Sequence, residues 1–188
     1  MPATSRPRLD RGRIVRSALV VIDRDSLGAL TVAAVANELG VGSPALYNHL
    51  ENLDELRYEV AIHTTVELTN ALRDAVLGHA GDDAIATLAH NYRHFAHLHP
   101  SRYASTLLPP KRPDDLLAQA TAALIEVFAR VIAAGYGLSG REAVHCARTT
   151  RSAIHGFVSL EAVNGFTDAA DRDDSFGHLI TTVIAGLR

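Results

Sequence analysis

Helical periodicity runs through almost the whole of this 188-residue chain, and it limits the fold more than any other feature. Apolar residues recur at spacings of three and four, whereas no run alternates as a β-strand does. Glycine, proline and capping residues divide the pattern into about nine helices, so we expect an all-α fold. The expected helices cover residues 10–24, 31–39, 44–50, 52–77, 83–98, 100–107, 114–134, 139–164 and 175–187.

Several residues at the ends of these helices are typical of helix caps. Thr31 is placed to cap the second helix, and Gly40 should end it in the left-handed conformation. Ser43 is the expected cap of the third helix. Asn52 and Ser139 each begin a variant of the capping box, and each should therefore open a long helix.

Composition favours a soluble globular protein. The chain is 47% apolar and 21% charged, which is ordinary for such proteins. It has no run of about 18 apolar residues, and its start lacks the apolar stretch of a signal peptide. Cys146 is the single cysteine, which excludes an intrachain disulfide. We therefore expect a cytoplasmic protein with no membrane partner.

Charge is unevenly distributed along the chain. The net charge is −3, yet the first residues are basic, with Asp10 as the acid among them. The basic residues there are Arg6, Arg8, Arg11, Arg13 and Arg16, and acids gather later at Asp168, Asp171, Asp173 and Asp174. A basic end on an acidic body is typical of a DNA-binding protein with a separate sensor domain, and equally of a chain with a solvated tail.

The segment from Leu30 to Leu56 carries the most specific pattern. It contains two short helices around a tight turn, in which Gly40 lets the chain reverse. The apolar residues expected to pack between the two helices are Val35, Ala36, Leu39, Val41, Leu46 and Leu50. This arrangement predicts a helix-turn-helix, whose second helix enters the major groove of DNA.

The outward face of that second helix is polar. Asn48 can offer a donor and an acceptor to adenine, and Ala45 can contact a thymine methyl group. Tyr47 and His49 have polar tips that can donate to phosphate oxygens. The predicted DNA-binding residues, including those at the helix N-termini, are Thr31, Ser43, Pro44, Ala45, Tyr47, Asn48 and His49. By pattern alone, an ordinary helical hairpin with a polar face remains the alternative.

The same segment resembles the TetR/AcrR signature. The matching residues are Leu30-Thr31, Ala36 to Val41, Ala45 to His49 and Glu55-Leu56, within a resemblance that covers about residues 10 to 60. It implies DNA contacts from Thr31, Ser43, Tyr47, Asn48 and His49. Two positions depart from the family pattern: Leu53 stands where lysine is common, and Ala34 where arginine is common. Both changes remove a cation, and the N-terminal arginines are candidates to replace it.

The C-terminal part resembles one TetR subgroup. Residues 95–100 are similar to its Phe-Ala-x-x-His-Pro element, and residues 154–161 to its His-Gly motif, with Arg151 near the usual tryptophan. The resemblance implies that the last two helices, about 141–164 and 175–187, pair with their copies in a homodimer. The candidate residues for this seam are Ile154, Phe157, Val158, Ile180, Val183, Ile184 and Leu187, and the alternative for them is an intramolecular core.

A pocket for a small molecule is expected among the middle helices. The candidate ligand-binding residues are Tyr92, Phe95, Tyr103, Leu107, Phe128, Ile132 and His155. Pockets of this kind are mostly apolar with a few polar anchors, but the same residues are also typical of a plain core. The sequence does not name the ligand.

Histidines give a competing interpretation. His90, His94 and His97 lie at spacings of four and three on one expected helix, a geometry that can bind metal. An all-helical metal-binding protein or enzyme that uses these three residues is therefore the alternative function. A helical adaptor with a vestigial DNA-binding module is a third. We expect no cofactor, metal or catalytic residue, because no cysteine or carboxylate completes the histidine set and no nucleophile–base pair is evident.

Taken together, these patterns predict a helix-turn-helix DNA-binding domain at residues 1–52 and a sensing and dimerisation domain at residues 53–188. The boundary should fall inside the long helix after Asn52, so that a shared helix transmits motion. The expected function is a ligand-responsive regulator that binds double-stranded DNA at a palindromic operator as a homodimer. A small-molecule effector would release it, as in a repressor, and it would not be an enzyme.

Overall fold

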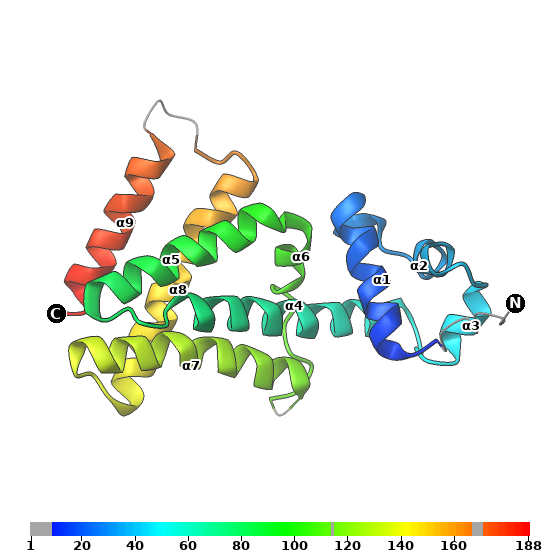
Figure 1. Ribbon diagram of the computed structural model, residues 1–188, viewed down its shortest axis with the longest axis horizontal. Helices are drawn as coiled ribbons and strands as arrows, with labels where there is room; N and C mark the ends of the chain where they lie inside the picture. Colours follow the sequence, from blue (N-terminus) through cyan, green and yellow to red (C-terminus); the bar gives the residue numbers. More distant parts are fainter. Residues whose placement is uncertain (1–8, 114, 167–170) are drawn as a thin grey trace, which may run out of the picture.

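The computed structural model describes residues 9–113, 115–166 and 171–188, and these residues form helices and loops without a β-strand. The α-helices are α1 (Arg11–Arg24), α2 (Val32–Leu39), α3 (Ser43–Tyr47), α4 (Leu53–Ala75), α5 (Gly81–Leu98), α6 (Pro100–Ser105), α7 (Leu116–Tyr136), α8 (Gly140–Ala162) and α9 (Arg172–Gly186). A short 3₁₀ helix, η1 (Leu27–Ala29), lies in the loop after α1. The expected all-α fold is therefore confirmed (Figure 1).

Three of the predicted helix ends match the structure. The Thr31 side chain accepts a hydrogen bond from the amide of Ala34, and Asn52 accepts one from Glu55. Gly40 ends α2 with a φ of 67°, in the left-handed region. These ends were predictable because a cap needs only residues that are close in sequence.

Other helix ends differ from the prediction, wholly or in one detail. Gly42 caps α3 with its backbone, and Ser43 is already the first helical residue. Ser139 is the N-cap of α8, as expected, but its side chain makes no capping hydrogen bond. Helix α7 runs beyond residue 134, where its end was expected: Gly135 lies within the helix, where a Cβ atom would come within 3.0 Å of Gly81, and Gly137 ends it with a φ of 69°. Asp114, the expected start of this helix, lies outside the described residues.

The first three helices pack around a core of their own. Ile14, Leu19 and Ile22 of α1 meet Val35 of α2 and Leu46 of α3, and all five are buried. This core also takes in Leu56 and Val60 from the start of α4. The N-terminal helices are therefore tied to the long helix α4 (Figure 1).

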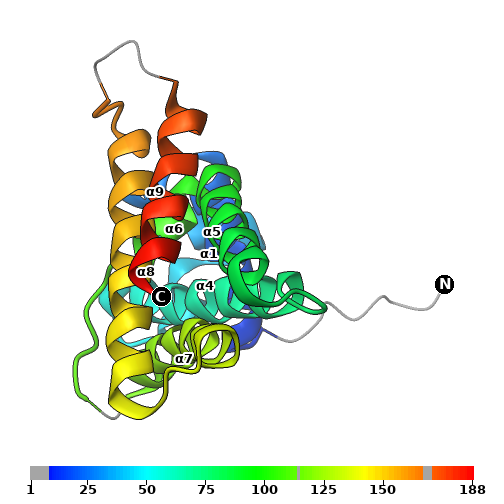
Figure 2. The same cartoon turned by 90° about the vertical axis from the view of Figure 1, so that its left-hand side faces the viewer.

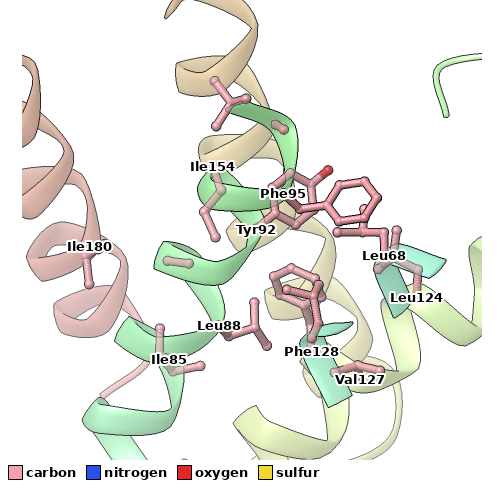
Figure 3. Packing of buried hydrophobic residues seen from close by; sticks show 14 of the residues in the cluster. Leu68, Ile85, Leu88, Tyr92, Phe95, Leu124, Val127, Phe128, Ile154 and Ile180 are labelled. Carbon is pink, nitrogen blue, oxygen red and sulfur yellow. The ribbon is translucent and has the colours of Figure 1, made fainter. Parts of the chain in front are cut away.

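A second core lies in the bundle formed by α4 to α9. Leu68 and Leu72 from the far half of α4 join α5, α7, α8 and α9 around Tyr92 and Phe128 (Figure 3). α8 and α9 run side by side on one face of the bundle (Figure 2). Because α4 contributes to both cores, it links the two parts of the molecule; a boundary after Asn52 stays a prediction.

Helix α7 is unusually apolar. Among the described residues it is the one helix whose length and hydropathy would suffice to cross a membrane. In the structure it contacts α4, α5 and α8, and its residues Leu124, Phe128 and Ile132 are buried against them. One face of α7 is therefore packed within the folded bundle.

The middle of α4 carries buried threonines. The hydroxyls of Thr65 and Thr69 donate to the carbonyl oxygens of Ala61 and Thr65, at 2.8 and 2.7 Å. The Thr64 hydroxyl is also buried but has no hydrogen-bond partner among the described residues. A buried polar group without a partner lowers stability.

Replacing Thr64 by valine is therefore expected to raise the free energy of unfolding by about 1 kcal/mol, because the shape is kept and an unpaired hydroxyl is removed. Urea denaturation followed by circular dichroism measures the change. Thr65→Val is the matched control, since its hydroxyl is bonded, and it should be neutral or destabilising. A destabilised Thr64→Val protein would show that this hydroxyl is satisfied in solution.

Candidate functional site

Helix α3 is held on the N-terminal core by one buried residue. Gly40 reverses the chain after α2, and the amide of Val41 bonds the carbonyl oxygen of Ala36 at 3.0 Å. Leu46 is fully buried between α1 and α2, and Leu50 follows it into the same core. The opposite face of α3 must therefore point away from the protein.

That face presents the predicted DNA-binding residues. Pro44, Tyr47 and Asn48 are exposed, and 55% of Tyr47 is accessible although it is a large aromatic residue. Ser43, Ala45 and His49 are half-buried beside them, and Thr31 is exposed at the start of α2. All seven thus lie on or beside the start of α2 and the α3 segment, at the end of the molecule opposite α9 (Figure 1). Their contact with DNA stays a prediction.

Two of the nearby arginines form ion pairs with acidic residues of the protein. Arg11 pairs with Glu55 at 2.8 Å and with Glu59 at 3.2 Å, and so fixes α1 on α4. Arg24 pairs with Glu38 of α2 at 2.9 Å. Leu53 and Ala34, where the family pattern often has cations, are half-buried. Arg6 and Arg8 lie outside the described residues.

Arg102 of α6 connects the bundle to the N-terminal helices. Its guanidinium donates to Asp23 of α1, with an Nε to Oδ1 distance of 2.7 Å, and to Glu67 of α4 at 3.1 Å. Helix α6 also contacts α1 and η1 directly. The hydrogen bonds to Asp23 outweigh burial and raise the pKa of Arg102, which stays charged. Sequence analysis missed this residue, because its partners lie 79 and 35 residues away.

The seven predicted ligand-binding residues have different environments. Tyr92, Phe95, Phe128 and Ile132 are buried in the bundle core, where they pack against other side chains (Figure 3). Leu107 is 53% exposed at the end of α6. These five therefore do not share a cavity in this structure.

Tyr103 and His155 form a polar group inside the bundle. The Tyr103 hydroxyl lies 3.2 Å from that of Tyr92 and is bonded to Nδ1 of His155, whose Nε2 lies 3.3 Å from the Ser159 hydroxyl. Burial, with a smaller effect of the Arg151 charge, lowers the pKa of His155 and keeps the imidazole neutral. Burial and the neighbouring Tyr92 raise the pKa of Tyr103, which stays a phenol.

The three histidines of the metal hypothesis have separate surroundings. His90 packs edge-on against Phe176, with ring centroids 5.5 Å apart, whereas Nε2 of His97 lies 3.0 Å from Glu161. Within residues 9–113, 115–166 and 171–188 no three histidines, cysteines or carboxylates are grouped as metal ligands would be.

Glu161 belongs to a second group that sequence analysis missed. Arg93 binds it with two hydrogen bonds, at 2.9 and 2.5 Å, and also pairs with Asp173 of α9 at 2.7 Å. The guanidinium lies 4.7 Å from the centre of the Phe176 ring. Burial favours protonation of Glu161, but hydrogen bonds from Arg93 and His97 outweigh it and lower the pKa of the carboxyl. Arg93 therefore joins α5 to α8 and α9.

Most of the predicted dimer-seam residues face inward. Ile154, Phe157, Val158, Ile180 and Leu187 are buried in the chain's own core. Val183 and Ile184 are half-buried. Here the structure follows the intramolecular alternative, because α8 and α9 turn their apolar faces toward α5.

The outward face of α8 carries other residues. Thr149, Ser152 and Leu160 are exposed at helical spacing, and a Cβ atom added to Gly156 would meet no other atom within 4 Å. On α9, Gly177, His178, Thr181 and Ala185 are exposed. Apart from Leu160 and His178 these residues are small, and small side chains let two helices approach closely.

Comparison with known proteins decides the family. The model of the tetracyclin repressor-like C-terminal domain matches residues 85–183, just over half of the chain. HTH-type transcriptional regulator Rv0681 of Mycobacterium tuberculosis is 38% identical over 188 residues, which cover 98% of this chain and 85% of that protein. The chain belongs to the TetR family.

Further relatives agree with this assignment. HTH-type transcriptional regulator YobS of Bacillus subtilis is 32% identical over 185 residues, covering 95% of this chain and 93% of YobS. FadR of Bacillus subtilis, solved in complex with stearoyl-CoA, has a TM-score of 0.71 over 94% of this chain and 99% of its own, at 11% identity, and so shows the fold alone. TetR regulators bind DNA through a helix-turn-helix. That this chain is not an enzyme stays a prediction.

Proposed function

We propose that this TetR-family chain is a homodimeric repressor that binds a palindromic operator through α3 and leaves it when a small molecule binds the bundle. The observation that carries this proposal is the arrangement on α3. Leu46 is fully buried, so Pro44 and Tyr47 of α3, and Asn48 directly after the helix, are exposed on the side away from the core. Such a face fits the major groove, with Asn48 able to bond adenine.

Dimerisation supplies the second copy of α3. The exposed small residues of α8 and α9 support pairing of these two helices across a two-fold axis. A two-fold dimer would present its two α3 helices to half-sites about 34–36 Å apart, one turn of DNA. The operator should therefore be a palindrome.

The link between effector and DNA would run through α6 and α4. Arg102 lies next to Tyr103, so a ligand that moves α6 also moves the ion pairs to Asp23 and Glu67. A coupling free energy of about 1–3 kcal/mol is enough for regulation. FadR, which has the same fold, binds stearoyl-CoA, and this supports an effector in the bundle. The protein would act in the cytoplasm.

The decisive variants are Asn48→Ala and Tyr47→Ala, tested by gel shift on the DNA upstream of the protein's own gene. Each should lower operator affinity, Asn48→Ala by about tenfold or more because a bidentate base contact contributes roughly 1–3 kcal/mol. Asn48→Ala should also relax the sequence preference, whereas Tyr47→Ala should weaken binding to all sequences alike.

Asn70→Ala, on α4 away from the α3 face, is the control and should bind as the unmodified protein does. Both α3 variants should keep the dimer and the melting temperature, since their side chains are exposed. Full operator binding by both variants would refute the proposed DNA face.

A further inference from the structure

A groove runs along the outside of the bundle between α7 and α8. Its volume is about 490 Å³, within the range of about 300–1,000 Å³ that small-molecule sites occupy. Ala118, Ala122 and Ile125 line it from α7, and Val144 lines it from α8. The groove therefore offers an apolar surface to an aliphatic or flat molecule.

Two arginines stand in this groove without an acidic partner. Arg148 and Arg151 are nearly one turn apart on α8, and neither forms an ion pair with any residue that the structure describes. Glu126 also lines the groove, but its carboxylate is bound by Arg130, at 2.6 Å. The apolar surface of the groove is thus flanked by two arginines that form no ion pair with the described residues.

Arg151 also has a buried donor. Its Nε is inaccessible to solvent and has no hydrogen-bond acceptor among the described residues. Buried donors in folded proteins almost always have an acceptor, and a guanidinium matches the two oxygens of a carboxylate or phosphate. An anion in the groove would pair with the guanidinium of Arg151 in this way.

The groove is connected to both parts of the molecule. Arg151 is close enough to His155 for its charge to help lower the pKa of that imidazole, after burial. At the other side, Pro110 lines the groove, and the amide of the next residue, Lys111, donates to the Tyr58 hydroxyl of α4 at 3.2 Å. A ligand here would act on the α6–α7 loop and, through Tyr58, on α4.

We propose that this groove is the effector site and that it takes an amphipathic anion, with a carboxylate or phosphate head on Arg148 and Arg151 and an aliphatic body along α7. The inference rests on the proposed function, because it names the effector class of the regulator. The two arginines indicate an anionic head group, and the alanines and isoleucine that line the groove indicate an apolar body.

Calorimetric titration of the full-length protein with decanoate and decyl phosphate, below their micelle concentrations, tests the proposal. Both should bind saturably, and decanol should bind at least about tenfold more weakly, because it lacks the charge that a guanidinium recognises. Whichever anion binds more tightly identifies the head group.

Variants locate the site. Arg151→Met and Arg148→Met should each weaken decanoate binding by about tenfold, the effect of losing one charged hydrogen bond. Arg141→Met, at an exposed position on the same helix, should leave it unchanged. Ala122→Phe fills the groove from an exposed position and should abolish binding while the helical circular dichroism signal stays intact.

Equal binding of decanol and decanoate, or full decanoate affinity in both arginine variants, would overturn the proposal. So would a dimer that dissociates in Arg151→Met while decanoate affinity is unchanged, since the groove would then be an interface between two copies. A gel shift of the unmodified protein without ligand tests the proposed function separately. If the protein does not bind the operator there, it is not the proposed regulator, while the titration still shows whether the groove binds an amphipathic anion.

Discussion

Replacing Arg93 by methionine is expected to lower the free energy of unfolding by about 3–5 kcal/mol, because it leaves the carboxylate of Glu161 buried without its main partner. The Glu161 side chain is 6% exposed, and Arg93 supplies two of its hydrogen bonds. The same substitution removes the ion pair with Asp173 of α9. Urea denaturation at pH 7 measures the loss.

Arg130→Met is the matched control for this prediction. Arg130 also pairs with a glutamate, but its side chain is 79% exposed, so the loss should be at most about 0.5 kcal/mol. Removing both partners, in Arg93→Met with Glu161→Leu, should recover part of the stability because no buried charge then stays unpaired. Equal losses in Arg93→Met and Arg130→Met would contradict a structural role for the Arg93–Glu161 pair.

Shortening Leu46 to alanine should cost about 3 kcal/mol of stability and abolish operator binding, because it leaves a cavity under α3. Leu46 is fully buried, whereas the other residues of α3 are exposed or half-buried. Hydrogen exchange of the amides in α1, α2 and α3 measures the local stability, and a gel shift measures the binding. The dimer should persist, since α8 and α9 are far from this core (Figure 1).

Two further variants distinguish a residue that supports α3 from one that contacts DNA. Leu107→Ala removes an exposed leucine and should change neither stability nor binding. Tyr47→Ala, one residue from Leu46, should reduce binding while exchange rates in the N-terminal helices stay the same. If the Leu46→Ala protein bound the operator as tightly as the unmodified protein does, α3 would not be the helix that recognises DNA.

The fold was predictable because its signals are local. Apolar residues three and four apart indicated each helix, and Thr31, Gly40 and Asn52 mark ends that the structure confirms. The position of Leu46 inside and of Tyr47 outside followed from the same spacing.

The sites in the bundle were less predictable because they depend on distant parts of the chain. Tyr92 and Phe128 suit a pocket or a core equally well by residue type, and only the packing of α5 against α7 puts them in the core. Arg93 and Glu161 are 68 residues apart, so no spacing pattern connects them. For Ile154, helical spacing gave an apolar face but not the neighbour that this face meets, which is the chain's own core.

A hydroxyl-radical footprint on the upstream DNA tests the central claim most directly. Two symmetric protected regions should appear, centred about one helical turn, roughly 10 base pairs, apart, and with Asn48→Ala both should need about tenfold more protein or above. A single protected region, or a footprint that Asn48→Ala and Tyr47→Ala leave intact, would contradict binding by a dimer through α3.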